Sequence, residues 1–449
     1  MSVYMIICLP ERGAYYPTFA LAHALEAHGH RALYPGLADF KEDVERQGLT
    51  FLTLFPDAPT SDPNVGEIPT SLLKKLLYLR KKAAQNPKRF HVLEAIANGD
   101  FAALLRAHRV DIVLLDPFLS QLAAVCRNAD VRVVSMATEL MNYKNHAIPP
   151  NCTVSAPSGA LARPLSYTLW GKHFLSIYGR RIAFFLATRL LFFPRAPREL
   201  RRKLKTLQKR AGLPSIFSEY SWRFDLPEIV LCPEAFDFPN ARGAGNRRYF
   251  GVTVDRQRVD VAFDHAIPPD KKVVYVSLGT HAAMYGKKVD RFIACLIEAA
   301  RTRPDCYFIV NIGKGNSPAK FGAPPQTVLL VNFAPQLQIL DRSAAIITNG
   351  GLGTVKEAIM AEVPMLVVPC RWDQFGNAAR VKFHGIGDYC NINKVTALQL
   401  QEQLDQILSD STYKTQLARM KKQVERDDEF AKGLQWLMAL AARDVSPSR

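Results

Sequence analysis

The sequence predicts an α/β protein with two doubly wound domains that face each other across a cleft. A chain of 449 residues is long enough for two domains with cores of normal size. Short apolar strands alternate with helical stretches through the first 140 residues, and the alternation returns from Leu226 onward. This order predicts parallel sheets, which bind ligands at the carboxyl ends of their strands.

The first half of the chain opens with an apolar strand that enters a turn at Gly13, and Pro17 then opens an amphipathic helix. From Met141 the alternation stops, and a loop leads into a long basic helical region that ends near Pro214. The predicted elements before that point are strands at 4–9, 31–34, 49–54, 110–116 and 131–136, and helices at 17–27, 40–47 and ending at 104–108.

The second half repeats the alternation and divides the chain into four expected parts. Its strands are predicted at 271–280, 307–313, 327–333, 344–348 and 365–369, and its helices at 290–302, 336–340 and 354–361. The expected parts are an N-terminal domain (1–225), a linker region (226–245), a C-terminal domain (246–425) and a C-terminal helix (426–449) that packs back on the N-terminal domain.

Positive charge is concentrated in two segments of a chain whose formal net charge is +17. Residues 170–210 contain twelve Lys and Arg against one acid, Glu199, and residues 71–91 contain seven basic residues and no acid. Both segments interleave these charges with Leu, Ile, Phe and Tyr, which favours peripheral contact with an anionic membrane over binding of nucleic acid. A solvated helix face explains the same pattern equally well.

The cysteines and the apolar segments indicate a cytoplasmic protein. The eight cysteines have no Cys-x-x-Cys pair and no regular spacing, which favours free thiols over a disulfide framework or a zinc site. The N-terminus has no basic lead before its short apolar run, so it does not resemble a signal peptide. Arg189 interrupts the longest apolar run, and no segment is expected to span a bilayer.

A glycine-rich turn joins a predicted strand to a predicted helix in "AAIITNGGLGTVKEAIM". Gly350, Gly351, Gly353 and Thr354 present backbone N–H groups at the start of this helix, where unpaired donors and the helix dipole attract phosphate oxygens. Glu357 follows one turn later, where its carboxylate is placed for ribose hydroxyls. A tight strand-to-helix connection also explains these glycines, so the turn alone does not decide the function.

The surroundings of this turn resemble the donor-binding signature of the family-1 glycosyltransferases, which use UDP-sugars and have the GT-B fold. Within that family the chain resembles the bacterial enzymes of the natural-product, lipid or carotenoid type. The resemblance covers nearly the whole chain and implies two Rossmann-like domains. It implies that the N-terminal domain (1–225) binds the acceptor and that the C-terminal domain (246–425) binds the nucleotide-sugar. The matching residues are Phe333, Pro335, Gln336, Asn349, Gly350, Gly351, Glu357, Asp373, Gln374 and Asn377.

The resemblance implies a role for each donor-side residue. Phe333 is expected to stack on the uracil, Gln336 and Glu357 to hold the ribose, and Asp373 and Gln374 to bind sugar hydroxyls. The residues expected to face the diphosphate are Ser277, Gly279, Thr280, Asn349, Gly350, Gly351, Gly353 and Thr354. Asn349 replaces the usual His and Phe333 the commoner Trp, which leaves UDP as the expected nucleotide and dTDP as the next.

The acceptor side lacks the family's usual base. In the family, a His in the first turn removes the acceptor proton, and an Asp at the end of a later strand orients that His. Asp116 ends the strand "VDIVLLD", but Ala14 stands at the His position. Four explanations remain open: another base (Asp116 itself or Glu11), an acceptor acidic enough to need little help, a relative that binds without turnover, or an engineered inactivation.

The acceptor is expected to contact Ala14, Tyr15, Tyr16 and Glu139. Irregular segments at 55–82, 138–157 and 165–193 mix aromatic, aliphatic and basic residues, which indicates a lipophilic molecule. The predicted activity is inverting transfer of a hexose from a UDP-sugar to a hydroxyl or carboxyl group, without a metal or another cofactor. A silent sugar-nucleotide or lipid-binding protein is the second hypothesis, and another GT-B enzyme, such as an epimerase or a cell-wall lipid-linked glycosyltransferase, is the third.

Overall fold

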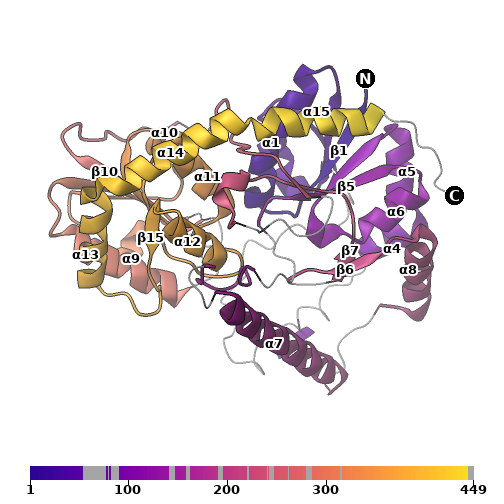
Figure 1. Ribbon diagram of the computed structural model, residues 1–449, viewed down its shortest axis with the longest axis horizontal. Coiled ribbons are helices and arrows are strands. Elements are labelled where there is room, and N and C mark those ends of the chain that lie inside the picture. The colour runs from indigo at the N-terminus through magenta and orange to yellow at the C-terminus, as the bar shows by residue number, and fades with distance from the viewer. Residues whose placement is uncertain are drawn as a thin grey trace.

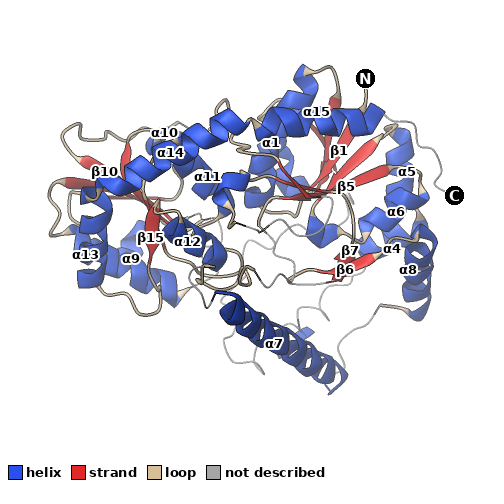
Figure 2. Ribbon diagram, in the orientation of Figure 1, coloured by secondary structure: helices blue, strands red, loops and turns tan. Residues whose placement is uncertain are grey.

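The computed structural model describes residues 1–53, 77–78, 80–81, 91–140, 147–157, 162–190, 196–219, 222–239, 241, 247–260, 262–279, 286–313 and 316–442. Within these residues the chain forms two parallel sheets, and Figure 2 shows them as two groups of strands with helices packed around each. The predicted α/β class with two doubly wound domains is confirmed. Most of the predicted basic segment 71–91 lies outside the described residues.

The N-terminal sheet contains seven parallel strands in the order β3-β2-β1-β4-β5-β8-β9 among the residues described. Helices cover both faces, so the central strands β1 and β4 are buried along their whole length. The strands are β1 (Val3–Ile7), β2 (Arg31–Gly36), β3 (Thr50–Thr53), β4 (Ile112–Leu115), β5 (Arg132–Ala137), β8 (Glu228–Val230) and β9 (Arg247–Tyr249). The helices are α1 (Arg12–Ala27), α2 (Lys41–Glu45), α4 (His91–Asn98), α5 (Asp100–Ala107) and α6 (Leu122–Asn128).

Helix α1 begins earlier than predicted, at Arg12, and Pro17 lies inside it. The backbone N–H groups of Ala14 and Tyr15 both donate to the carbonyl oxygen of Glu11, at 2.9 and 3.2 Å. These bonds close the first helical turn before the proline is reached. Ala14 therefore lies in the first turn of a helix and not in the preceding loop.

The expected linker at 226–245 is part of the N-terminal domain. Strand β8 pairs in parallel with β5, and β9 pairs in parallel with β8, so both extend the first sheet. Each of these strands has only three residues, which is too short for a recognisable hydrophobic pattern. The connection between the two sheets instead follows β9 and reaches to residue 271.

The C-terminal sheet contains six parallel strands in the order β12-β11-β10-β13-β14-β15, again counted over the described residues. Its strands are β10 (Lys272–Ser277), β11 (Cys306–Asn311), β12 (Val328–Val331), β13 (Ser343–Thr348), β14 (Met365–Val367) and β15 (Gly387–Tyr389). Its helices are α9 (Lys287–Ala300), α10 (Gln336–Leu340), α11 (Leu352–Met360), α12 (Gln374–Phe383), α13 (Ala397–Ser409) and α14 (Ser411–Asp427).

The basic region after residue 160 forms two helices, α7 (Ala162–Leu190) and α8 (Arg198–Ala211), and the hairpin β6 (Ser215–Phe217) and β7 (Trp222–Phe224) follows them. Helix α7 lies along the lower edge of the molecule in Figure 1, away from both sheets. Among its described side chains, only a narrow stripe is buried, at Ser166, Trp170, His173 and Ile177, a spacing that defines one face of a helix. Among the described residues, no helix is both long and apolar enough to cross a membrane.

The last described helix, α15 (Glu429–Ala442), returns from the C-terminal domain to the N-terminal one, and Figure 1 shows it crossing the upper side of the molecule. Leu434 and Leu437 are buried in the same core cluster as Tyr4 and Ile6 of β1. The two domains are therefore joined twice, by the connection after β9 and by this helix.

Candidate functional site

A cavity of about 430 Å³ lies where the carboxyl ends of the two sheets meet. Its lining includes residues just after β1, β4 and β5 of the first sheet and after each of β10 to β14 of the second. Two doubly wound sheets that face each other in this way create a ligand site between them. The chain thus brings residues from Leu9 to Gln374 into one pocket.

The glycine-rich turn between β13 and α11 forms part of the C-terminal wall. Gly351, Gly353 and Thr354 line the cavity, and Gly351 precedes the first residue of α11. Asn349 also lines it, and its Oδ1 accepts the N–H of Gly351 at 3.2 Å. Gly279 has φ of +78°, and a Cβ there would lie 2.7 Å from Nδ2 of Asn349. A side chain at position 279 would therefore displace the asparagine.

Glu357, one turn into α11, is held by partners on both oxygens. Gln336 Nε2 donates to Glu357 Oε2 and also to the Thr354 hydroxyl, at 3.1 Å in the second case. Arg258 Nη1 lies 3.1 Å from Glu357 Oε1, and both side chains are largely buried. Gln336, Thr354 and Glu357 are thus assembled as one polar group, and the half-buried ring of Phe333 lines the same cavity.

Asp373 and Gln374 lie at the start of α12, after the end of β14, and both line the cavity. Asp373 is buried and accepts a hydrogen bond of 2.9 Å from Asn377 Nδ2. Burial raises the pKa of Asp373 to about 6, although the bond from Asn377 opposes this shift. Oε1 of Gln374 accepts the backbone N–H groups of Cys370 and Arg371, which fixes the loop before α12.

Asp116 stands on the opposite wall, directly after β4. It is buried, and it accepts the N–H of Phe118 at 2.9 Å and the N–H of Leu9 at 3.4 Å. Burial raises the pKa of Asp116 to about 6, against the lowering effect of these two backbone donors. Ala14 lines the cavity from the first turn of α1, and its methyl group can neither accept nor donate a proton.

Glu139 adds a further carboxyl group to the cavity, beyond the end of β5. Burial raises its pKa well above the usual range, and the negative charges of Asp373, Asp116 and Glu11 raise it further. Glu11 precedes α1 and also lines the cavity. Carboxyl groups of both domains therefore interact across the pocket, and Glu139 holds its proton most strongly.

The comparisons with known proteins agree with this geometry. Residues 297–432 match the family described as erythromycin biosynthesis protein CIII-like, C-terminal domain. An NDP-glycosyltransferase of Bacillus subtilis is 23% identical over 428 residues, which cover 94% of this chain and 92% of that protein. The chain is similar to glycosyltransferases over nearly its whole length, and to the erythromycin-biosynthesis family over most of its C-terminal domain.

Solved structures of glycosyltransferases superpose on almost the whole chain. The glycotransferase of kitacinnamycin superposes with a TM-score of 0.66 at 20% identity, over 97% of this chain and 98% of that one. Glycosyltransferase VinC in complex with dTDP superposes with a TM-score of 0.60 at 18% identity, over 99% and 100% of the two chains. These likenesses establish the fold.

Two predicted site residues do not line the cavity. Tyr15 is buried, and its ring stacks on Phe40 with centroids 4.9 Å apart, because it lies on the face of α1 that packs against the domain core. Gly350 donates its N–H to the Thr348 hydroxyl at 3.2 Å and is also absent from the cavity lining. Thr280 lies outside the described residues. The other predicted site residues line the cavity.

Sequence reasoning missed the arginines of the site. Arg258 comes from the connection after β9, pairs with Asp260 as well as Glu357, and lies over the ring of Tyr16 at 4.9 Å. Arg12 pairs with Asp43 at 2.8 Å, and Arg371 lies over Trp372 at 3.8 Å. All three line the cavity, but they occur in loops and a helix start without a recognisable spacing.

Proposed function

We propose that this chain catalyses inverting transfer of a hexose from a UDP-sugar to a hydroxyl or carboxyl group of a lipophilic small molecule. One observation carries the proposal. The pocket that contains Gln336, Glu357 and Asp373 on one wall also contains the buried carboxyl group of Asp116 on the other. A donor held by the first wall and an acceptor held by the second meet within a single cavity.

The donor wall offers a partner for each part of a sugar nucleotide. Phe333 would stack on the base, and Gln336 and Glu357 would hold the ribose. The start of α11 and the turn that contains Ser277 and Gly279 would receive the diphosphate, as helix N-termini commonly do. Asp373 and Gln374 would bind sugar hydroxyls.

UDP is the proposed nucleotide and dTDP the alternative, which the dTDP complex of VinC supports. The proposal includes no metal or other cofactor. The N-terminus of α11 and the guanidinium of Arg258 supply positive potential for the leaving diphosphate in the proposed mechanism.

Asp116 is the proposed base. Its pKa of about 6 leaves it ionised at neutral pH, yet basic enough to take a proton as the acceptor attacks. In this step the acceptor oxygen bonds to the anomeric carbon, the bond from that carbon to the diphosphate oxygen breaks, and the acceptor proton passes to Asp116. Glu139, which retains its own proton, would donate a hydrogen bond to a substrate oxygen.

A test compares nucleoside diphosphate release with UDP- and dTDP-sugars and a panel of lipophilic acceptors. Asp116→Asn should lower kcat by about 10² to 10⁴, whereas Asp130→Asn, an exposed carboxylate outside the cavity, should leave it unchanged. The wild-type rate should fall as the pH drops through about 6, because protonated Asp116 cannot act as a base.

Asp373 has a similar pKa and would produce the same acid limb if it were the base. Because we assign the base to Asp116, Asp373→Asn should raise the KM for the donor and retain the acid limb of the pH profile. Full activity of Asp116→Asn would refute the assignment of the base.

A catalytically silent binding protein is the second candidate, because Ala14 occupies the position of the usual histidine. The variant Ala14→His distinguishes an active glycosyltransferase from a catalytically silent binding protein. If the wild type binds UDP by calorimetry but releases none, and Ala14→His restores turnover, the chain is a binding relative or an inactivated form. If the wild type turns over, the silent candidate is excluded.

A further inference from the structure

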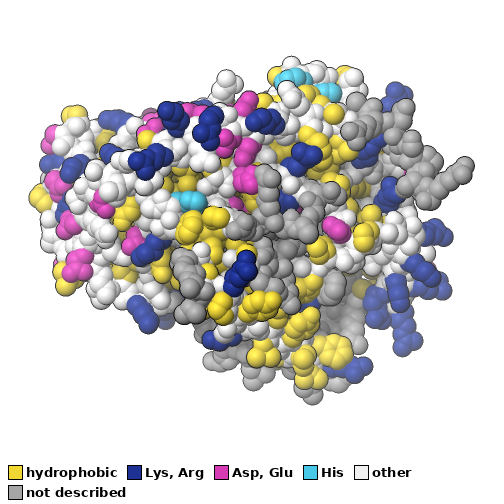
Figure 3. All heavy atoms as spheres, in the orientation of Figure 1, with side chains coloured by type: hydrophobic (Ala, Val, Ile, Leu, Met, Phe, Trp, Pro, Cys, Tyr) yellow, Lys and Arg dark blue, Asp and Glu magenta, His cyan; other side chains and the backbone are white. Residues whose placement is uncertain are grey.

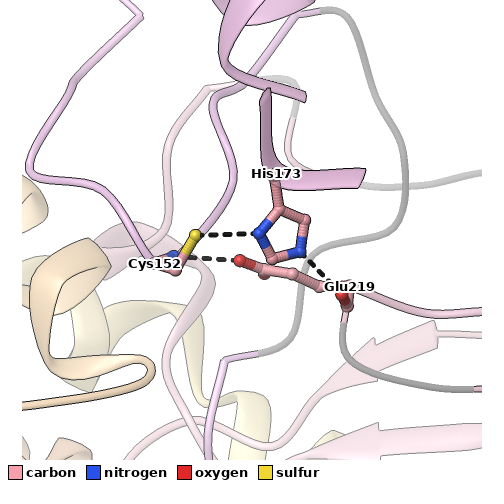
Figure 4. A group of neighbouring side chains, drawn as sticks. All are labelled: Cys152, His173 and Glu219. Atoms are coloured by element: carbon pink, nitrogen blue, oxygen red, sulfur yellow. Dashed lines mark hydrogen bonds between the residues drawn. The ribbon is translucent and has the colours of Figure 1, made fainter. Parts of the chain in front are cut away.

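Three side chains with metal-binding atoms meet outside the sugar-transfer cavity. Cys152 lies in the loop at 147–157, His173 is on the buried stripe of α7, and Glu219 follows β6. Figure 4 shows the sulfur, the imidazole and the carboxylate of these residues directed toward one another. Their candidate ligand atoms all lie within 4.8 Å of one another, and none of the three residues lines the cavity.

Backbone groups already orient the members of this cluster. His173 Nε2 lies 2.7 Å from the carbonyl oxygen of Glu219, which holds the imidazole with its Nδ1 toward the sulfur of Cys152 at 3.1 Å. The N–H of Cys152 donates to Glu219 Oε1 at 2.9 Å. A hydrogen bond from one ring nitrogen to a backbone carbonyl is the usual arrangement when the other nitrogen binds a metal.

We propose that Cys152, His173 and Glu219 bind a zinc ion. Thiolate, imidazole and carboxylate are the three ligand types that zinc takes in proteins. Softer cations bind carboxylate less well, and harder cations bind thiolate less well. Binding would release the thiol proton of Cys152 to solvent, and the His173 Nδ1 lone pair would bond to the metal. A water would complete a tetrahedral site with three protein ligands.

The site would fix a loop that reaches the other domain. Asn151, next to Cys152, donates to the carbonyl oxygen of Leu140 and accepts a hydrogen bond of 2.7 Å from Arg380 of α12. Zinc would therefore couple α7 to a loop that touches the C-terminal domain, near the end of β5 where Glu139 lies. The ion has a positioning role, and the sugar-transfer step does not use it.

The test uses the full-length protein after removal of metals with a chelator. Titration with zinc alone should give one equivalent bound and a higher Tm, since a ligand that binds only the folded state stabilises it. Substitution with Co²⁺ should give a thiolate-to-cobalt charge-transfer band. Failure of the wild type to retain stoichiometric zinc, or to develop this band, would overturn the proposal and leave the cluster as a hydrogen-bond network.

Variants assign the ligands. Cys152→Ser and His173→Gln should each abolish the cobalt band and the zinc-induced rise in Tm. Cys295→Ser changes a half-buried free cysteine of α9 and should preserve both signals. Far-UV circular dichroism of each metal-free variant confirms that it is folded. A band that persists in folded Cys152→Ser protein would contradict the site. None of these readouts requires activity, so the result is independent of the proposed sugar transfer.

Discussion

Arg258 contacts both walls of the cavity, the donor wall of the C-terminal domain and the opposite wall of the N-terminal domain, where we propose that the acceptor binds. Its guanidinium pairs with Glu357 at 3.1 Å and with Asp260 at 3.2 Å, and it lies over the ring of Tyr16 on α1. It contacts one oxygen of the carboxylate that we propose holds the ribose. The same pairing holds the Glu357 carboxylate in place at the wall of the cavity.

Arg258→Met should weaken donor binding and destabilise the fold. Removal of one partner from a buried ion pair leaves an uncompensated charge, at a cost of about 3 kcal/mol. We expect a KM for the UDP-sugar at least about tenfold higher (about 1.4 kcal/mol) and a lower Tm. Arg256→Met, at an exposed neighbour, is the control. The double variant Arg258→Met/Glu357→Gln should recover part of the stability, and simple additivity would contradict coupling between the two residues.

Single residues were predictable where they follow a regular element. Asp116 and Asp373 follow strands, and Glu357 follows a helix start, so strand order and spacing locate them near one another. The resemblance places Tyr15 at the acceptor, but α1 starts at Arg12, before the predicted Pro17, and Tyr15 lies on the face of this helix that packs in the core. Arg258 was not predictable, since its contacts depend on the path of a loop.

At the scale of elements, α7 has a surface that the domain core does not explain. Apart from its buried stripe it exposes aromatic and aliphatic side chains, with Leu175 76% exposed. Figure 3 shows hydrophobic side chains gathered over α7, and basic ones over the nearby α8. Exposed members of α8 include Arg201, Arg202 and Lys205. An anionic membrane surface complements both features, and we propose peripheral contact there.

Sedimentation with vesicles of anionic and of zwitterionic lipid tests this contact. Binding should require anionic lipid and weaken with salt, because the basic side chains act through screened charge. Leu175→Glu/Ile182→Glu should lower binding by about tenfold or more, since two apolar side chains would leave the membrane. Leu398→Glu, at an exposed leucine of α13, is the matched control. Equal binding by both variants would show that α7 does not contact the lipid.

At the scale of the molecule, the sequence predicts two doubly wound domains because each has long, apolar strands in alternation with helices. The boundary between the domains lies later in the chain than predicted, because β8 and β9 are too short to show a hydrophobic pattern. These two strands join the first sheet, although α7 and α8 separate them in sequence from β5. These strands pair with residues that are far away in the sequence, so the local pattern of apolar residues does not predict the pairing. The same limit applies to the zinc cluster, whose ligands come from three separate segments.

One buried set of contacts between the domains involves Arg380 of α12, which is fully buried. Its Nη2 lies 2.7 Å from Asp237 Oδ1, its Nη1 donates to Asn151, and its guanidinium lies over Phe238 at 4.3 Å. Asp237 also accepts a hydrogen bond of 2.7 Å from the Tyr249 hydroxyl of β9. Its pKa is lowered despite burial, chiefly by Arg380. This network ties the C-terminal domain to the segment that ends the first sheet.

Arg380→Met should therefore cost about 3 to 5 kcal/mol of stability, because Asp237 would remain buried without its charge partner. Lys382→Met, on the same helix, breaks an exposed pair with Asp388 and should cost less than about 1 kcal/mol. Thermal unfolding of both variants measures the difference. Because the network also sets how the donor and acceptor walls meet, Arg380→Met should lower kcat even at temperatures where it is folded. Equal Tm values for the two variants would show that the contact between the domains does not depend on this ion pair.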